Sequence, residues 1–166
     1  MSEIFERWKN ARCVFNGDFY SVTAYSGYRA LNLDTSRGNY MLTSDVSDEE
    51  LGIVILDALS KSRLIDPDDN FFDNEKKAER YKEWVKLLME TYNYRSKRQL
   101  FKKMHNCGIQ LLDGQITIRP SSHEKLEGWS EDGISEADYV VIPADSSPEE
   151  VGAALRLAFS RCRSYV

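Results

Sequence analysis

The stretch from Tyr139 to Arg163 constrains the fold most strongly, because it joins an apolar strand to a capped amphipathic helix. It reads YVVIPADSSPEEVGAALRLAFSRCR, and its first four residues are typical of a buried strand. Ser147 stands where a helix N-cap belongs, and Pro148 follows at the first helical position. The spacing predicts a helix over 149–162 with one apolar face, formed by Val151, Ala154, Leu155, Ala158, Phe159 and Cys162.

The same organisation occurs one hundred residues earlier, in residues 40–63. The identical residues in this first copy are Asp45, Ser47, Glu49, Glu50, Gly52, Ala58, Ser60 and Arg63. This internal similarity predicts a pseudo-repeat with half-repeats at about 11–63 and 107–163, separated by a helical insertion at 75–104. Chance similarity between two capped amphipathic helices is the alternative explanation.

Two dipeptides predict tight β-hairpins between stretches rich in β-branched and aromatic residues: Asn16-Gly17 and Asp113-Gly114. The polar stretch 120–138 is expected to be irregular, with one helical turn near 123–127. The chain is therefore expected to form a single α+β domain over residues 1–166. Its core would be a mostly antiparallel sheet of about six strands with helices packed on it.

Composition excludes several classes of protein. A net charge of −5 argues against nucleic-acid binding, and no apolar run approaches the roughly 20 residues that span a bilayer. The N-terminal MSEIFER has early acids and no apolar stretch, so no secretory signal is expected. Three widely spaced cysteines suggest reduced, packed thiols. These features predict a cytoplasmic protein without a membrane partner.

Catalytic signals are weak. His123-Glu124-Lys125-Leu126-Glu127 resembles the start of a zinc-protease helix, but Glu127 stands where the second histidine must be. Pro67-Asp68 followed by Glu75-Lys76-Lys77 resembles a nuclease pattern superficially, with a spacing too short for that metal site. We therefore expect no enzyme, no metal and no cofactor. A small metal-dependent nuclease or hydrolase remains the enzymatic alternative.

Uncompensated acidic charge is more informative about function than these catalytic motifs. Residues 65–75 and 123–138 are acidic, and both segments contain aromatic residues. Aromatic side chains can anchor an interface while carboxylates steer a basic partner towards it. The expected partner-binding residues are Asp66, Asp68, Asp69, Phe71, Phe72, Asp73, Glu124, Glu127, Trp129, Glu131 and Asp132. A solvated surface with no partner is the alternative for either segment.

The C-terminal half resembles a known family. The run YRSKRQLFKKMHNCGIQLLDGQITIRPSSHEKLEGWSEDGIS, followed by VVIPADSSPEEVGAALRLAFSRC, is similar to the immunity proteins (CdiI) of bacterial contact-dependent growth inhibition systems. The similarity is close over about 94–162 and looser over 1–93. Its specific elements are Lys-Arg-x-Leu-Phe-Lys at 97–102, the segment 123–127, and the turn at 143–147 with its helix.

This resemblance implies a non-catalytic cytoplasmic protein that binds the C-terminal toxin domain of a growth-inhibition exoprotein. Neutralising that domain protects the producing cell. Toxins in such systems are often nucleases, and an acidic protein suits a basic nuclease as a partner. The resemblance itself supplies no binding residues, so the acidic and aromatic residues named above are predicted to bind the toxin from their charge and composition alone. No direct nucleic-acid contact is expected, and a homo-oligomer is possible. A non-catalytic, homo-oligomeric structural protein is the remaining alternative.

Overall fold

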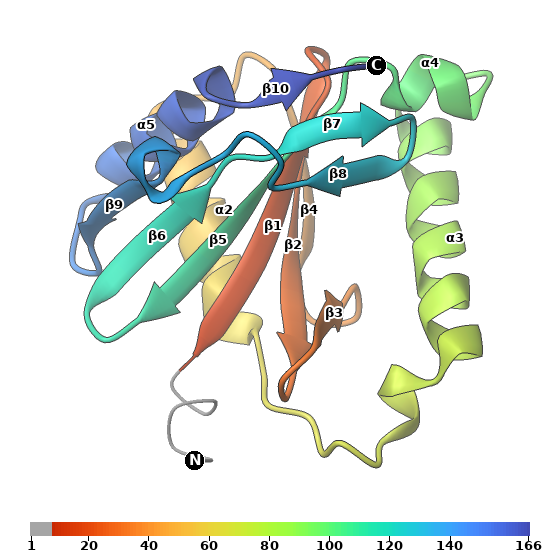
Figure 1. Cartoon of the computed structure of the whole chain (residues 1–166), viewed down its shortest axis with the longest axis horizontal. Helices are drawn as coiled ribbons and strands as arrows, with labels where there is room; N and C mark the ends of the chain where they lie inside the picture. Colours follow the sequence, from red (N-terminus) through yellow and green to blue (C-terminus); the bar gives the residue numbers. More distant parts are fainter. Residues whose placement is uncertain (1–7) are drawn as a thin grey trace.

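The computed structural model describes residues 8–166 and has an α+β fold dominated by one antiparallel sheet (Figure 1). Residues 1–7, where no secretory signal is expected, lie outside the described residues. The sheet order is β3-β2-β1-β5-β6-β9, and β4 also pairs with β2. Its strands are β1 (Lys9–Phe15), β2 (Phe19–Gly27), β3 (Leu31–Leu33), β4 (Asn39–Thr43), β5 (His105–Leu112), β6 (Gln115–Arg119) and β9 (Val140–Pro143).

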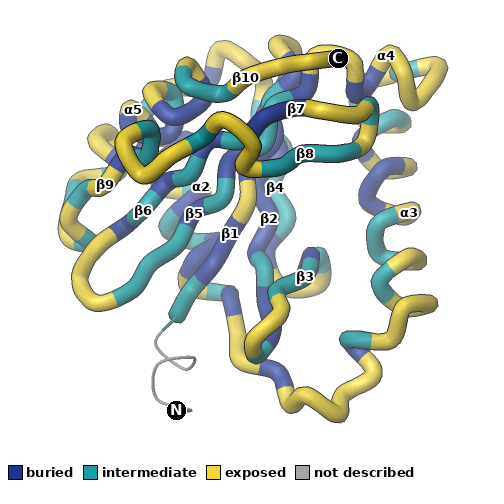
Figure 2. The backbone as a smooth tube through the Cα atoms, in the orientation of Figure 1, coloured by how far each residue is buried: buried dark blue, intermediate teal, exposed yellow. Residues whose placement is uncertain are grey.

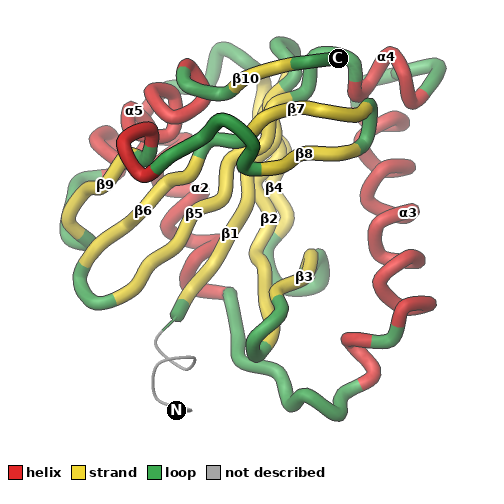
Figure 3. Tube along the Cα trace, in the orientation of Figure 1, coloured by secondary structure: helices red, strands yellow, loops and turns green. Residues whose placement is uncertain are grey.

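The helices and a small second sheet complete the fold (Figure 3). The α-helices are α2 (Asp48–Lys61), α3 (Asn74–Thr91), α4 (Lys97–Phe101) and α5 (Pro148–Ser160). Two short 3₁₀ helices are η1 (Asn70–Phe72) and η2 (Glu136–Asp138). The second sheet has the order β10-β7-β8 and consists of β7 (Ser122–Lys125), β8 (Gly128–Ser130) and β10 (Arg163–Ser164).

Both predicted hairpins are confirmed. Gly17 has a φ of 98°, and Asp113 and Gly114 have φ values of 49° and 77°. Asn-Gly and Asp-Gly pairs tolerate this left-handed backbone, which matches the twist of the flanking strands. The two hairpins join through β1 and β5, which pair antiparallel at the centre of the sheet and place Cys13 opposite Cys107.

Helices α2 and α5 pack on the same face of the sheet, where the larger part of the hydrophobic core forms. Their predicted caps are confirmed: Ser47 Oγ accepts from the Glu50 amide at 3.1 Å, and Ser147 Oγ accepts from the Glu150 amide at 3.2 Å. The predicted apolar face of α5 is also buried (Figure 2), except that Cys162 is only half-buried.

Two glycines allow these helices to cross in backbone contact. A Cβ added at Gly52 would lie 1.7 Å from the carbonyl oxygen of Pro148. Reciprocally, a Cβ added at Gly152 would lie 2.0 Å from the carbonyl oxygen of Asp48. Every other residue carries a Cβ, so only glycine fits at either contact.

The two halves of the chain also share a strand arrangement. In each half, the second strand of the hairpin pairs antiparallel with the strand that precedes the helix, β2 with β4 and β6 with β9. Together with the reciprocal glycine contacts, this shared arrangement supports our proposal that 11–63 and 107–163 are half-repeats.

The opposite face of the sheet is covered over only part of its area. Helices α3 and α4 form a second apolar cluster with Val14, Phe19 and Leu33. Trp84 of α3 also donates its Nε1–H to Ser21 Oγ at 3.3 Å. In Figure 1, α3 stands on the β2 side of the sheet and leaves the face of β1, β5 and β6 without a covering helix. This uncovered face is where a partner can approach the sheet.

The segment 120–138 differs from expectation. The helical turn predicted near 123–127 is wrong, because this region is the β7–β8 hairpin. Strand β10 pairs with β7 in parallel, and the side chains of Ser122 and His123 are fully buried. Burial and pairing with a strand distant in sequence therefore override a weak local helical preference.

Asp34 holds the chain against the sheet at the start of the acidic segment 65–75. Its carboxylate is buried and accepts hydrogen bonds from Ser26 Oγ at 2.5 Å and from Ser36 Oγ at 3.1 Å. The Arg63 guanidinium donates to both carboxylate oxygens, at 2.9 and 3.3 Å. The hydrogen bond to Asp34 raises the pKa of Arg63, against the opposing effect of burial. The chain therefore enters segment 65–75 from a fixed position.

Replacing Asp34 with alanine should lower the free energy of unfolding by about 3 kcal/mol, because it removes charged hydrogen bonds and leaves buried donors unpaired. Urea denaturation followed by circular dichroism measures this change. The control Ser36→Ala removes a single hydrogen bond at the rim and should cost under about 1 kcal/mol. Equal losses in the two variants would show that the buried carboxylate has no special role.

Candidate functional site

The uncovered face of the sheet carries polar side chains from three adjacent strands. Strand β1 contributes Asn10 and Arg12, and β6 contributes Arg119. Strand β5 lies between them and contributes Asn106, Gly108 and Gln110. Apolar residues at the alternate positions, such as Ala11, Ile109 and Ile118, point into the core beneath α2 and α5. The result is a polar surface on a rigid sheet.

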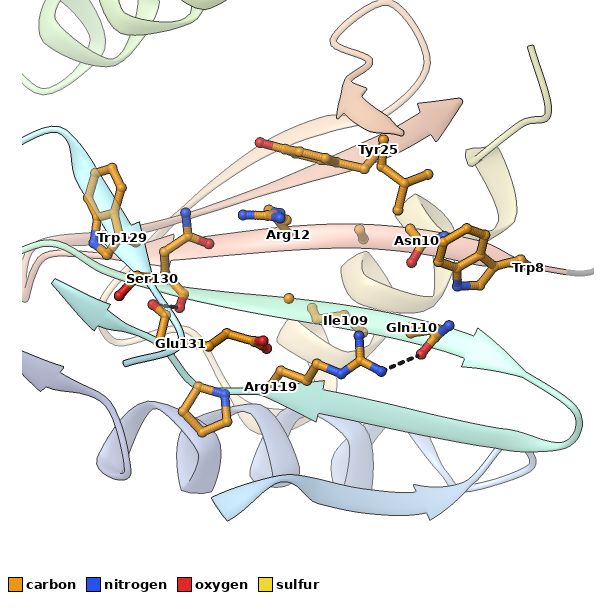
Figure 4. A pocket seen from close by; sticks show the side chains of 16 residues that line it. Trp8, Asn10, Arg12, Tyr25, Ile109, Gln110, Arg119, Trp129, Ser130 and Glu131 are labelled. Atoms are coloured by element: carbon orange, nitrogen blue, oxygen red, sulfur yellow. Dashed lines mark hydrogen bonds between the residues drawn. The ribbon is translucent and has the colours of Figure 1, made fainter. Parts of the chain in front are cut away.

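This surface is hollowed. A cavity of about 210 Å³ lies over β1, β5 and β6, with Trp8 and Trp129 at its two ends (Figure 4). A second cavity of about 320 Å³ extends from it towards Trp84 of α3. The two cavities share four lining residues: Arg12, Tyr25, Asn106 and Trp129. We call this continuous depression the sheet groove.

Two arginines give the sheet groove positive charge. The Arg12 guanidinium lies 4.9 Å from the centre of the Tyr25 ring and is exposed. Arg119 donates from Nη2 to Gln110 Oε1 at 3.1 Å and lies 5.3 Å from the centre of the Tyr139 ring. Within residues 8–166, neither arginine forms an ion pair. Both cations are therefore available to an acidic or carbonyl group.

Several buried polar atoms in the same groove lack hydrogen-bond partners among the described residues. They are Asn10 Nδ2, Asn106 Oδ1 and Arg119 Nε, one from each of three adjacent strands. An unsatisfied buried polar group costs about 1–3 kcal/mol. Such groups are normally satisfied by water or by a bound partner. Three such atoms thus lie together in one groove, where water or a bound partner can reach them.

The first acidic segment is folded rather than loose. Arg80 Nη2 donates to the Phe71 carbonyl at 2.7 Å, and its guanidinium lies 3.9 Å from the centre of the Phe71 ring. Asp69 Oδ1 accepts from the Phe71 amide at 2.8 Å, and Asp66 Oδ1 accepts from the Asp68 amide at 2.9 Å. All three aspartates are exposed. Phe71 is therefore an internal anchor that presents the aspartates on a fixed loop.

Phe72 and Asp73 complete this segment. The half-buried Phe72 ring packs edge-to-face on Phe71 at 5.3 Å and lines an open hollow with Tyr28 and Pro67. Asp73 is exposed and stands at the N-cap of α3 without a side-chain cap hydrogen bond. Neither residue lines the sheet groove, since segment 65–73 lies at the lower end of the view in Figure 1.

The second acidic segment forms one wall of the sheet groove. Trp129 donates from Nε1 to the Met104 carbonyl at 2.9 Å and stacks on His123 with ring centres 4.8 Å apart. Glu127 accepts from the Tyr81 hydroxyl at 2.8 Å and pairs with Lys97 at 3.7 Å. Burial, followed by the hydrogen bond to Glu127, raises the pKa of Tyr81. These contacts hold the β7–β8 hairpin against α3 and α4.

The remaining acids differ in position. Glu131 lines the groove and accepts from the Tyr139 hydroxyl at 3.3 Å, whereas Glu124 and Asp132 are exposed. Trp129, Glu131 and Glu127 are thus the predicted partner-binding residues that line the groove or its extension. Arg12, Asn106 and Arg119 were not among the residues predicted from the sequence. The signal that could have identified them is the alternation of polar with apolar residues along three neighbouring strands.

Residues 8–166 contain no group of three or more histidine, cysteine, aspartate or glutamate side chains that could hold a metal ion. Among the helices described, none combines the length and apolar character needed to cross a membrane.

Comparisons with known proteins agree on one family. The protein-family model described as CDI immunity protein (CdiI) matches residues 9–162 of the chain. The chain is similar to Immunity protein CdiI-YPIII of Yersinia pseudotuberculosis serotype O:3 (strain YPIII). The two are 44% identical over 167 residues, an alignment that covers 92% of this chain and 94% of the relative.

Two solved structures share the fold over nearly the whole chain. One is described as the CdiA-CT/CdiI toxin and immunity complex from Yersinia pseudotuberculosis, and the matching chain is 41% identical with a TM-score of 0.88. That match covers 94% of this chain and 98% of the other. The second, a protein of unknown function (NMB0488) from Neisseria meningitidis, is 38% identical with a TM-score of 0.89, covering 95% and 97%.

Proposed function

The chain belongs to the CdiI family of CDI immunity proteins, and from this premise we propose that it binds and neutralises the toxin domain of its own growth-inhibition system. The observation that carries the proposal is the likeness, at 41% identity, to a chain solved in a toxin and immunity complex. The protein acts stoichiometrically, without catalysis, in the cytoplasm of the cell that makes the toxin. Neutralisation means that binding covers the surface the toxin needs for its activity.

The sheet groove is the proposed centre of the toxin interface. Its Arg12 and Arg119 guanidiniums form no ion pair within residues 8–166, and three of its buried polar atoms have no hydrogen-bond partner there. Aromatic rings lie at its two ends. Aromatic and arginine side chains around a desolvated pocket are typical of residues that dominate binding energy. Toxin carboxylates or main-chain carbonyls would satisfy Arg12, Asn10 and Arg119 there. The groove thus supplies both anchoring and register.

The acidic segments supply long-range attraction. Asp66 and Asp68 are exposed on a folded loop, and Glu124 and Asp132 are exposed on the β7–β8 side. A toxin that acts on nucleic acid carries positive charge along its substrate path, and we propose that the toxin is a nuclease of this kind. Carboxylates at the periphery of an interface mainly accelerate association. The groove would then determine the affinity for the toxin, and the acidic segments would determine the rate of association.

Growth protection tests the proposed function. The toxin domain encoded beside this protein is produced inside cells from an inducible promoter, with and without the chain. Survival should require the chain, and a toxin domain from an unrelated system should kill despite it. If the chain leaves the neighbouring toxin fully active when both proteins are abundant, the proposed function is wrong.

Reversing the charge of Asp66, Asp68 and Asp69 to lysine should slow toxin association by about tenfold at low salt, because electrostatic steering is lost. The difference should shrink as ionic strength rises. Surface plasmon resonance at several salt concentrations measures both effects. The matched control reverses Asp45, Asp57 and Asp145, which lie on the α2–α5 side of the sheet. Equal slowing by both triples would assign the effect to net charge alone.

A further inference from the structure

Two of the three cysteines lie together where the last helix meets the sheet. Cys107 is in β5, fully buried, and Cys162 follows the C-terminal end of α5. Their sulfur atoms are 3.6 Å apart. The family assignment and the proposed toxin binding give this pair no role.

The two thiols differ in their surroundings. Cys162 is half-buried, whereas Cys107 lies behind it in the core beside Cys13 of the neighbouring strand. The hydrogen bond with Cys107 lowers the pKa of Cys162, helped by a backbone hydrogen bond from Ser121 and opposed by burial. Burial raises the pKa of Cys107, and the neighbouring Cys162 raises it further. A half-buried thiol whose pKa is lowered therefore lies directly against a fully buried thiol whose pKa is raised.

We propose that Cys162 and Cys107 are a redox modification site that closes to an intramolecular disulfide when the protein meets a peroxide. The Cys162 thiolate attacks the peroxide, its sulfur is oxidised to sulfenic acid, and hydroxide leaves. The Cys107 sulfur then attacks the sulfenic sulfur, and its thiol proton departs with the released hydroxyl as water. Two thiols are oxidised and one peroxide is reduced, which for hydrogen peroxide yields two water molecules. A dithiol reductant reverses the change.

The disulfide would fix the C-terminal strand to the main sheet. Cys162 immediately precedes β10, and the Arg163 amide donates to the Ser121 carbonyl at 3.0 Å. The Tyr165 amide donates to the His123 carbonyl at 2.8 Å, so β10 supports β7. The β7–β8 hairpin is a wall of the sheet groove. Oxidation would thus lock one wall of the groove to β5 and α5.

Intact mass spectrometry tests the proposal on the full chain. The protein is treated with hydrogen peroxide, denatured, and its free thiols are alkylated. We expect a loss of two hydrogen atoms, one alkylated cysteine instead of three, and a peptide that links Cys107 to Cys162. Dithiothreitol should restore three alkylated cysteines. The oxidised protein should also unfold at a higher temperature, because the cross-link restricts the unfolded chain.

Three single variants separate this pair from other thiol chemistry. Cys162→Ser and Cys107→Ala should abolish the intramolecular link, while Cys13→Ala should retain it, provided that circular dichroism reports folded protein. Peptide mapping of the wild type decides the case even if a core variant fails to fold. Three alkylatable thiols after oxidation, a Cys13 link, or only intermolecular dimers would each overturn the proposal.

Discussion

Gly152→Ala should lower the free energy of unfolding by about 3 kcal/mol or more, because it overpacks the contact between two helices. The new methyl group would lie 2.0 Å from the Asp48 carbonyl oxygen, and a backbone atom cannot rotate away. Helices α2 and α5 would have to separate, which disrupts the core between them and the sheet. The gain in helix propensity, about 1 kcal/mol, offsets only part of this cost.

Gly52→Ala should cost a similar amount, because its methyl group would lie 1.7 Å from the Pro148 carbonyl oxygen. Gly108→Ala is the matched control, since a Cβ there meets nothing within 4 Å. It should leave stability unchanged or raise it slightly, because glycine weakens a strand. Urea denaturation of the three variants measures the differences. If all three variants had the stability of the wild type, the close helix crossing would be refuted.

Filling the sheet groove should abolish most toxin binding while the fold survives. Gly108 lies among Asn10, Arg12 and Arg119 on the groove floor, and Gly108→Trp would place an indole where the partner docks. We expect affinity to fall about 100-fold or more, which corresponds to about 3 kcal/mol. Calorimetric titration with the toxin domain measures the loss, and circular dichroism reports the fold.

The control for this variant adds the same side chain elsewhere. Ile53 is half-exposed on α2, on the far side of the sheet from the groove, so Ile53→Trp should leave toxin affinity unchanged. A second variant, Arg12→Glu, keeps the groove open and reverses one of its charges. It should weaken binding mainly by faster dissociation. Normal affinity in both groove variants would place the toxin interface on another surface.

Most of the fold could be predicted from local signals in the sequence. Positive φ at Gly17 and Gly114, and hydroxyl caps at Ser47 and Ser147, each depend on a few neighbouring residues. The β7–β8 hairpin was missed because its order depends on β10, which is distant in sequence, and on the burial of His123. Pairing of that kind leaves little trace in local composition.

The candidate site was harder to predict than the fold. Aspartates such as Asp66 were conspicuous as charge, whereas Arg12 and Arg119 looked like ordinary outward-facing strand residues. They line the groove only because α2 and α5 both cover the same face and leave the other open over β1, β5 and β6. The side on which a helix packs is a property of the tertiary structure. Phe71 illustrates the converse, since a predicted interface aromatic is buried against Arg80.

We propose that this chain neutralises its toxin by direct, specific binding. Isothermal titration calorimetry of the purified chain with the toxin domain encoded beside it tests this proposal. We predict saturable one-to-one binding with the neighbouring toxin domain and no heat of binding with a domain from an unrelated system. Two folded, active proteins that give no binding heat at any temperature, and that elute separately in size-exclusion chromatography, would contradict the account.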